Sequence, residues 1–241
     1  MQKRLDILVC EQMGVSREYA KEIILSGKCI VGGIIVTKPG SRFPKDCALE
    51  ISSEKLPYVS RGGIKMAHAI KKFGIDLTSR LCIDIGASTG GFTDCMLQNG
   101  AAAVIALDNG HGQLAEKLRS DPRVISMEGV NIMTVDTDKL PFIPSFAAVD
   151  LSFISLEKVI HKVLEILNTN GQAVFLLKPQ FECGPKALNK KGVVTSLTSH
   201  ITAIQKIVTA IISSGMLVRD MDFSPITGQN GNIEYLIFAE K

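Results

Sequence analysis

A glycine-rich turn flanked by two carboxylates is the part of this sequence best suited to chemistry. Asp84 lies inside the apolar run Leu81–Ile85, and the turn Gly86–Gly91 follows it directly. A ligand can lie against a glycine backbone, and free N–H groups at the start of the next helix can face it. Asp108 ends the following apolar run, where a carboxylate can accept hydrogen bonds from two hydroxyls. The pattern predicts a nucleoside-cofactor site at the end of a parallel strand.

The glycine spacing narrows the choice of cofactor. The turn reads G-x-x-x-G-G, whereas dinucleotide enzymes carry G-x-G-x-x-G. S-adenosylmethionine (SAM) has no phosphate but carries an ammonium, a sulfonium and a ribose, which suit a carboxylate before the turn and another after it. A structural role for Asp84 in the turn is an equally strong alternative. The residues expected to hold SAM are Asp84, Gly86, Ala87, Ser88, Gly90, Gly91, Phe92 and Asp108.

Alternating strands and helices must position this turn. Strand-like apolar runs occur at 81–85, 104–107, 124–127, 146–149 and 173–177. Helical segments are predicted between them and beyond, at 92–99, 111–119, 156–167 and 201–213. The alternation predicts a parallel sheet with helices on both faces. Two final strands, at 218–223 and 233–238, have only a loop between them, so we expect them to pair antiparallel.

The N-terminal part of the chain is organised differently and is basic. Ser16 is predicted to cap a helix, and Gly32-Gly33 between two apolar runs predicts a hairpin with positive φ at both glycines. Residues 1–80 hold 14 Lys and Arg against 8 Asp and Glu, whereas residues 81–241 hold 13 against 16. This imbalance suggests a polyanionic partner, with ordinary charged surface as the alternative. We expect one domain at 1–55, a linker at 56–60 and a second domain at 61–241.

Composition favours a cytoplasmic protein. The six cysteines are scattered, with no C-x-x-C or Cys/His cluster, which is typical of reduced thiols and offers no metal site. No apolar run approaches the ~18 residues of a membrane helix, and the N-terminus does not read as a secretion signal.

The N-terminal sequence resembles the RNA-binding domain first seen in ribosomal protein S-four. The resemblance is carried by RLDILV and by SREYAKEIILSGKCIVGGIIVTKPG, with Gly32 where that family usually has Asn. It implies that structured RNA binds here, through phosphates more than through base choice. The RNA-binding residues we expect are Arg4, Arg17, Lys21, Lys28, Lys38 and, beyond this segment, Arg61.

Nearly the whole chain is similar to the TlyA or hemolysin-A family of RNA 2′-O-methyltransferases, whose catalytic domain is related to FtsJ. The matching segments are VSRGGIKM, DIGASTGGFTD, ALDNGHGQL, DPRVISMEGVNI, VDLSFISL, LKPQFE and GNIEY. The resemblance implies an α/β fold: a seven-stranded, Rossmann-like SAM-dependent methyltransferase sheet with an antiparallel last strand, plus a small N-terminal α+β RNA-binding domain. It also implies ribosomal RNA or a ribosomal subunit as partner, a cytidine as target, and Asn131 and Asp150 as further SAM contacts.

Four catalytic residues follow from the same resemblance. They are Lys65 in RGGIK, Asp150 in VDLSF, Lys178 in LLKPQ and Glu234 in GNIEY. A ribose 2′-hydroxyl must lose its proton as it attacks a methyl group. Lys178 could take that proton if burial and Lys65 disfavoured its charged form, while the two carboxylates orient the ammonium groups.

Three other functions compete with this interpretation. An RNA-binding protein with an inactive methyltransferase domain is disfavoured by the intact set of four residues. A cytolytic hemolysin is disfavoured because no membrane-spanning run is present. A dinucleotide oxidoreductase is disfavoured by the glycine spacing. The target nucleotide, the assembly state of the RNA substrate and the oligomeric state stay open.

Overall fold

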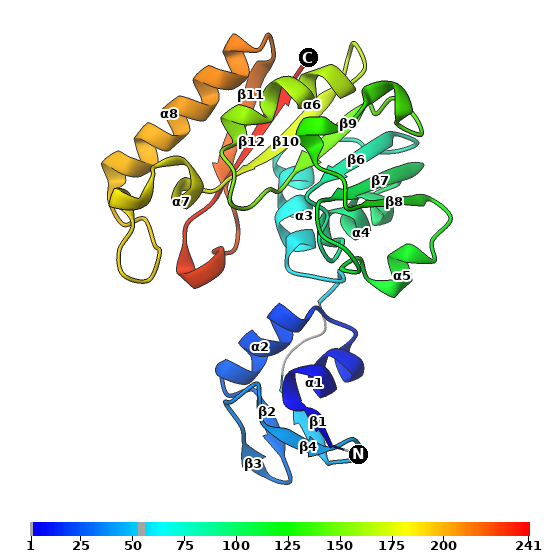
Figure 1. The fold of residues 1–241 in the computed structure, drawn as a ribbon, viewed down its shortest axis with the longest axis vertical. Coiled ribbons are helices and arrows are strands. Elements are labelled where there is room, and N and C mark those ends of the chain that lie inside the picture. The colour runs from blue at the N-terminus through cyan, green and yellow to red at the C-terminus, as the bar shows by residue number, and fades with distance from the viewer. Residues whose placement is uncertain (1, 53–55) are drawn as a thin grey trace. The chain divides into compact units, whose positions relative to one another are not determined.

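A computed structural model describes residues 2–52 and 56–241 of the chain (Figure 1). The chain divides into two compact units, Met1–Arg61 and Gly62–Lys241, and each is described by itself. Within the described residues, no helix combines the length and the apolar character needed to cross a membrane.

The first unit is a small α+β module. Its elements are β1 (Gln2–Arg4), α1 (Leu5–Met13), α2 (Arg17–Leu25), β2 (Cys29–Val31), β3 (Ile34–Ile35), β4 (Arg42–Pro44) and β5 (Leu49–Ile51). The strands form a β1-β4 pair and a sheet of order β3-β2-β5. The core lies between the two helices and the strands, and includes the fully buried Leu5, Val9, Ala20 and Ile24.

Two local predictions for this unit are confirmed. Ser16 caps α2, because its hydroxyl accepts a hydrogen bond from the backbone N–H of Tyr19 at 3.3 Å. Gly32 and Gly33 have φ of 57° and 80°, and the strands on either side pair antiparallel. Positive φ at both turn residues is the geometry that a two-residue hairpin requires, so Gly32 serves where an Asn could also stand.

The second unit is built on a seven-stranded sheet. Its strands are β6 (Leu81–Ile85), β7 (Ala103–Asp108), β8 (Val124–Glu128), β9 (Phe146–Val149), β10 (Gln172–Leu177), β11 (Leu217–Phe223) and β12 (Tyr235–Glu240), in the order β11-β12-β10-β9-β6-β7-β8. The five strands from β6 to β10 run parallel, and β12 runs antiparallel to both of its neighbours. The predicted seven-stranded sheet with an antiparallel last strand is therefore confirmed.

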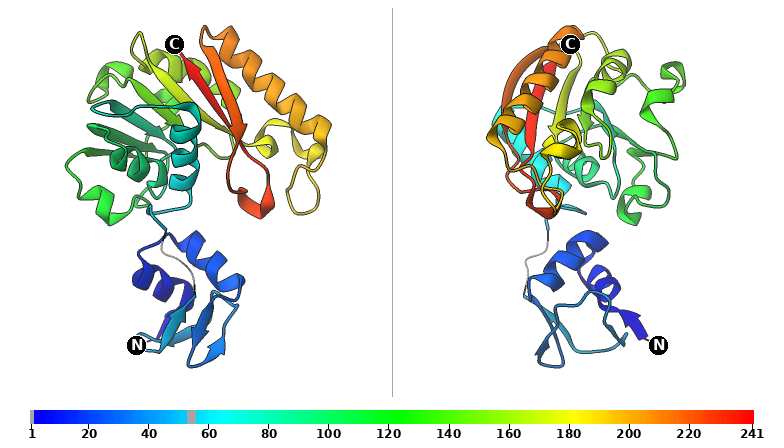
Figure 2. Two further views of the ribbon diagram at one scale, coloured as in Figure 1. Left: turned by 180° about the vertical axis from the view of Figure 1, so that it is seen from behind. Right: turned by 60° about the vertical axis from the view of Figure 1, so that its left-hand side comes forward.

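Helices cover both faces of this sheet (Figure 2). They are α3 (Gly62–Phe73), α4 (Gly91–Gln98), α5 (Glu116–Arg119), α6 (Ile160–Ile166), α7 (Pro179–Glu182) and α8 (Leu197–Ser213). Ile83 and Ile85 point into the main core, which α6 and α8 close. Asp84, between them, points to the opposite face and contacts Thr93 of α4, as the alternation of side chains along a strand requires.

Three helix predictions need correction. The segment 111–119 is helical only at Glu116–Arg119, because the carboxylate of Glu128 binds the N–H groups of Gly112, Gln113 and Leu114 in a loop instead. The segment 156–167 is a separate 3₁₀ turn followed by α6. The last helix begins four residues earlier than predicted, at Leu197, because Ser196 caps it by accepting from the N–H of Ser199.

Candidate active site

The glycine-rich turn joins β6 to α4 at the carboxyl end of the parallel strands. Asp84 is 1% exposed, and its Oδ2 atom accepts hydrogen bonds from the N–H and the hydroxyl of Thr93, at 2.9 and 2.6 Å. Its other oxygen, Oδ1, is buried and has no hydrogen-bond partner among the described residues. Burial raises the pKa of Asp84 to about 7, and the charges of Asp150 and Asp108 add to the rise. A buried carboxylate oxygen without a partner suits the ammonium group of a ligand.

The second carboxylate is held by backbone donors. Asp108, at the end of β7, accepts from the N–H of Ser88 at 2.8 Å and from the N–H of Gly110 at 2.7 Å, one on each oxygen. Each oxygen has a second lone pair that stays available for a ligand hydroxyl. The turn after β6 and the loop after β7 are thereby fixed to the same side chain.

Two glycines of the turn are required by geometry. Gly86 and Gly90 have φ of 88° and 91°, which disfavours any other residue. A Cβ on Gly86 would lie 2.2 Å from the carbonyl oxygen of Asp150. A Cβ on Gly90 would lie 2.2 Å from the side chain of Leu118. Gly86 therefore lets the cofactor turn pack directly against the segment that carries Asp150.

The four residues of the proposed catalytic set form two ion pairs. Lys65, in the first turn of α3, lies with its Nζ 2.5 Å from Oε2 of Glu234, just before β12. These side chains are only 11% and 2% exposed. Lys178, just after β10, lies with its Nζ 2.6 Å from Oδ1 of Asp150, just after β9. The second contact is an ion pair without the alignment of a hydrogen bond, since this buried Oδ1 has no well-oriented donor among the described residues.

Electrostatics connect the two pairs. Burial alone would raise the pKa of Asp150, but the charges of Lys178 and Lys65 outweigh it and the pKa is lowered. Lys65 is therefore close enough to act on the carboxylate that binds Lys178. The charge of Asp150 in turn acts on Asp84 in the cofactor turn. One cluster at the carboxyl edge of the sheet thus contains both ion pairs and the cofactor turn.

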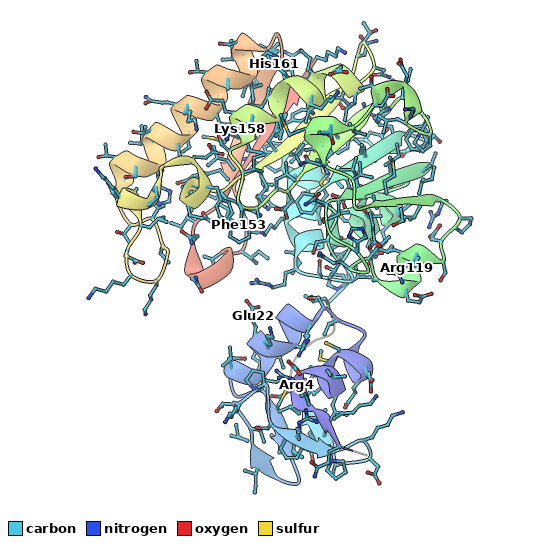
Figure 3. All side chains as sticks on the ribbon, in the orientation of Figure 1. Arg4, Glu22, Arg119, Phe153, Lys158 and His161 are labelled. Carbon is cyan, nitrogen blue, oxygen red and sulfur yellow. The ribbon has the colours of Figure 1, made fainter. Side chains whose placement is uncertain are left out.

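Sequence reasoning missed several groups around this cluster. The hydroxyl of Ser152 accepts a hydrogen bond from Lys178 Nζ at 3.0 Å. Phe153 has φ of 64°, is 87% exposed and lies 5.1 Å from the ring of Phe181, between ring centroids (Figure 3). In the VDLSF segment only the aspartate was a candidate site residue, because no sequence pattern distinguishes an exposed phenylalanine from a buried one.

Of the remaining cofactor candidates, Asn131, Ala87 and Ser88 lie on loops, and Phe92 lies in the first turn of α4. Asn131 caps a 3₁₀ turn at Ile132–Thr134, with its Oδ1 accepting from the N–H of Met133 at 3.0 Å. Ser88 has φ of 48° and donates its hydroxyl to Gln113 at 3.1 Å, while Ala87 and Phe92 are buried. Their contacts to SAM stay predictions.

A separate hollow of about 560 Å³ lies outside this cluster, beside α8. His161 and Lys206 are among the residues that line it, and His161 is marked in Figure 3. The ammonium group of Lys206 already binds Glu157 and Glu182, at 3.1 Å each. None of the residues proposed for SAM or for catalysis lines this hollow.

The basic residues expected to bind RNA have different surroundings in the first unit. Arg4 and Arg17 both donate to Asp6, which is fully buried, at 2.9–3.0 Å. Arg61 pairs with Glu22 at 2.9 Å. The other three, Lys21, Lys28 and Lys38, are exposed. Asp6 therefore fixes two guanidinium groups, whose side chains stay 38% and 52% exposed.

Replacing Asp6 by asparagine is expected to destabilise the first unit by about 2 kcal/mol, since hydrogen bonds to charged groups contribute ~1.5–3 kcal/mol. The hydrogen bond from Arg4 holds the pKa of Asp6 below its usual range, against the opposing effect of burial. The stabilisation that the ionised Asp6 provides is therefore present above the unfolded-state pKa of this carboxyl and is lost as pH falls through its folded-state pKa. Hydrogen exchange of the α1 and α2 amides measures this, with the exposed Asp46→Asn as control. Equal protection in both variants would contradict a stabilising role for Asp6.

Gly228 is expected to position Glu234. A Cβ at this position would lie 1.9 Å from Oε1 of Glu234, and the backbone here is not left-handed. Gly228→Ala should therefore fold normally but displace the carboxylate from Lys65, and misplacement by about 1 Å can cost ~100-fold in rate. Methyl-transfer kinetics of Gly228→Ala and of the exposed neighbour Thr227→Ala test this. An unchanged kcat for Gly228→Ala would contradict the role of Glu234.

Comparison with known proteins identifies the family. Residues 58–241 match the FtsJ-like methyltransferase family. The 16S/23S rRNA (cytidine-2′-O)-methyltransferase TlyA of Mycobacterium tuberculosis is 34% identical, over 96% of this chain and 87% of its own. The chain belongs to the TlyA/hemolysin-A family of FtsJ-like methyltransferases. As a member of this family it is a SAM-dependent methyltransferase.

Two further members of the TlyA/hemolysin-A family are similar to this protein over nearly the full length of its chain. The 23S rRNA (cytidine-2′-O)-methyltransferase TlyA of Campylobacter jejuni is 30% identical, over 99% of both chains. The structure of a protein described as a hemolysin from Streptococcus thermophilus is 41% identical, covers 100% of this chain and 88% of its own, and has a TM-score of 0.81.

Proposed function

We propose that this protein transfers a methyl group from SAM to the ribose 2′-hydroxyl of a cytidine in ribosomal RNA. The observation that carries the proposal is that two ion pairs, the buried Lys65–Glu234 and the half-buried Lys178–Asp150, lie with the cofactor turn in one cluster. The TlyA relatives of this family act on cytidine in ribosomal RNA, as their names state. The cytoplasm, which composition favours, would be its place of action.

The residues present fit SAM. Asp84 offers a buried oxygen without a partner for the ammonium group, and Asp108 offers free lone pairs for the ribose hydroxyls. When bound, SAM supplies a methyl group activated by the positive charge of its sulfonium. Gly86 lets the turn lie against Asp150, so the donor would be held beside the ion pairs.

Positioning and proton acceptance are the work of the four charged residues. Lys178 lies at a strand end, held by Asp150 and Ser152. After its ammonium group has released a proton to solvent, the neutral amine would accept the proton that the 2′-hydroxyl loses. Lys65, fixed by Glu234, adds a second positive charge near the developing alkoxide. Because the donor is already activated, holding the hydroxyl in line with the methyl group should supply much of the rate.

Features of both units suit an RNA substrate. The exposed ring of Phe153 packs on Phe181, whose ring also lies beside Lys178, and it could stack on an unstacked base, which is how proteins often read single-stranded RNA. In the first unit, Lys21, Lys28 and Lys38 offer exposed positive charge for phosphates. We propose that this unit, with residues 56–60 as linker, delivers the RNA.

Mapping of ribose methylation tests the function. Ribosomal RNA from cells with and without the protein should differ at one or a few cytidines. Purified protein, SAM and RNA from the deficient cells should restore the methyl groups, either on free RNA or only on an assembled subunit. Identical maps, together with no methyl transfer to either form of the RNA, would overturn the proposal.

A further inference from the structure

A basic loop in the second unit is not part of the site described above. Residues 184–194, here called the lysine loop, connect α7 to α8 and carry Lys186, Lys190 and Lys191, all exposed. No Asp or Glu occurs anywhere between residues 183 and 219. Within the described parts of the chain, none of the three lysines forms an ion pair, whereas Lys178 and Lys206 nearby in sequence both do. The positive charge of the loop is therefore uncompensated.

The lysine loop is ordered by its own hydrogen bonds. Leu188 and Val194 form an antiparallel bridge at its base. The side-chain oxygen of Asn189 accepts from the N–H groups of Lys191 and Val193, at 2.8 and 3.0 Å. This arrangement presents the two neighbouring lysines at the tip and lowers the ordering entropy that a ligand must overcome.

Asparagine side chains fasten the lysine loop to the segment that carries Glu234. Asn232 is 2% exposed; its Oδ1 accepts from the N–H of Val194 at 3.1 Å, and its Nδ2 donates to the carbonyl of Gly192 at 3.0 Å. Asn230 donates to the carbonyl of Lys191 at 3.0 Å. In Figures 1 and 2 the two loops, yellow and red, project from the same end of the unit.

A buried histidine makes a second connection at the same place. His200 of α8 is 5% exposed. One ring nitrogen lies 3.0 Å from the carbonyl oxygen of Val194, and the other lies 3.0 Å from the hydroxyl of Tyr235, the residue after Glu234. The base of the lysine loop and the start of β12 are therefore joined on both sides of Glu234.

We propose that the lysine loop binds backbone phosphates of the substrate RNA and that Asn232 transmits its position to Glu234. Three uncompensated ammonium groups on an ordered loop suit a nucleic acid backbone, which they recognise by charge and not by sequence. The loop is hydrogen-bonded to the segment that carries Glu234, so it would bind nucleotides that flank the target ribose. This inference rests on the proposed function for its substrate class and adds a second RNA contact besides the first unit.

Removal of the three charges tests the binding step in the full chain. The triple variant K186Q/K190Q/K191Q should bind RNA on the order of 10-fold more weakly and raise the KM for RNA, with SAM affinity unchanged. The logarithm of the RNA association constant should fall less steeply with the logarithm of the salt concentration. The slope should become shallower by about 2, since each lost single-strand phosphate contact accounts for ~0.7. The charge-matched control K71Q/K139Q/K158Q, from exposed positions of the same unit, should leave the slope within about 1 of the wild type.

Equal slopes and affinities for the two triple variants would overturn the binding step. Because RNA affinity is measured without turnover, this result is separate from the proposed function: a wild type that fails to methylate RNA, with a lysine-loop variant that loses salt dependence, would refute only the activity.

Loss of the asparagine connection tests the coupling step. Asn232→Ala should lower kcat about 10-fold while RNA and SAM affinities stay within 2-fold, since misplacing Glu234 affects the reaction and not the binding. Asn230 has φ of 59°, so Asn230→Gly removes its side chain without backbone strain and should lower kcat in the same direction. A lower melting temperature with unchanged kcat in both variants would overturn the coupling.

Discussion

Replacement of Lys178 by alanine is expected to lower kcat for methyl transfer by about 1,000-fold, within the ~100- to 10,000-fold range of general base catalysis. The side-chain nitrogen of Lys178 lies 2.6 Å from Asp150 and 3.0 Å from the hydroxyl of Ser152, so its position is fixed before substrate binds. Alanine removes the proton acceptor, while the charge of Lys65 still acts on Asp150. Single-turnover kinetics with saturating SAM and RNA measure the effect.

Two further substitutions separate proton transfer from charge. Lys178→Arg keeps a cation beside Asp150 but cannot accept a proton at neutral pH, so it should be as inactive as alanine. Lys158→Ala, at an exposed position of the same unit, should leave kcat unchanged. SAM affinity of Lys178→Ala should stay within a few-fold of the wild type. Retention of more than a tenth of the wild-type kcat by alanine or arginine would rule out the role of Lys178 as base.

Replacement of Asp84 by asparagine is expected to weaken SAM binding by about 10- to 100-fold at pH 7.5, because a hydrogen bond to a charged group contributes ~1.5–3 kcal/mol. Burial is the main reason why the pKa of Asp84 is raised to about 7 in the wild type, so this side chain is largely protonated below that pH. A cationic ligand favours the ionised form. SAM affinity of the wild type should therefore rise between about pH 6 and 7.5, with release of a proton.

The same pKa has a consequence for stability without ligand. A carboxyl whose folded-state pKa lies above the unfolded-state value of ~3.9 stabilises the fold in its protonated form. That contribution is present at low pH and is lost as pH rises from about 4 to 7. Asp84→Asn cannot ionise, so its free energy of unfolding should lack this slope and should not fall below that of the wild type at pH 8.

Calorimetric titration with SAM in buffers of different ionisation enthalpy measures both affinity and proton release for Asp84. Thr198→Ala, at an exposed position on α8, serves as a control that should keep the wild-type pH dependence. If Asp84→Asn binds SAM as tightly as the wild type and with the same pH profile, Asp84 is a structural carboxylate of the turn.

Sequence patterns predicted most of the fold because most of its helices and strands have local causes. The alternation of apolar runs and helical segments gave the parallel sheet, and the missing helix after residue 223 gave the antiparallel last strand. The helix expected at 111–119 failed because Glu128, on the next strand, binds the backbone of that segment. Helix propensity along the segment cannot take account of hydrogen bonds to a carboxylate on another strand.

The sequence by itself determined the cofactor turn: Gly86, Gly90 and the acids around them specify a strand, a turn with positive φ and a ligand without pyrophosphate. Only the tertiary structure decided how the charges pair. Lys65 and Glu234 are 169 residues apart, yet their side chains meet in a buried contact, and Lys178 meets Asp150 at the neighbouring strand end. The physical reason is that burial makes an unpaired charge costly, so the partner of each charge is set by which strand ends the sheet brings together.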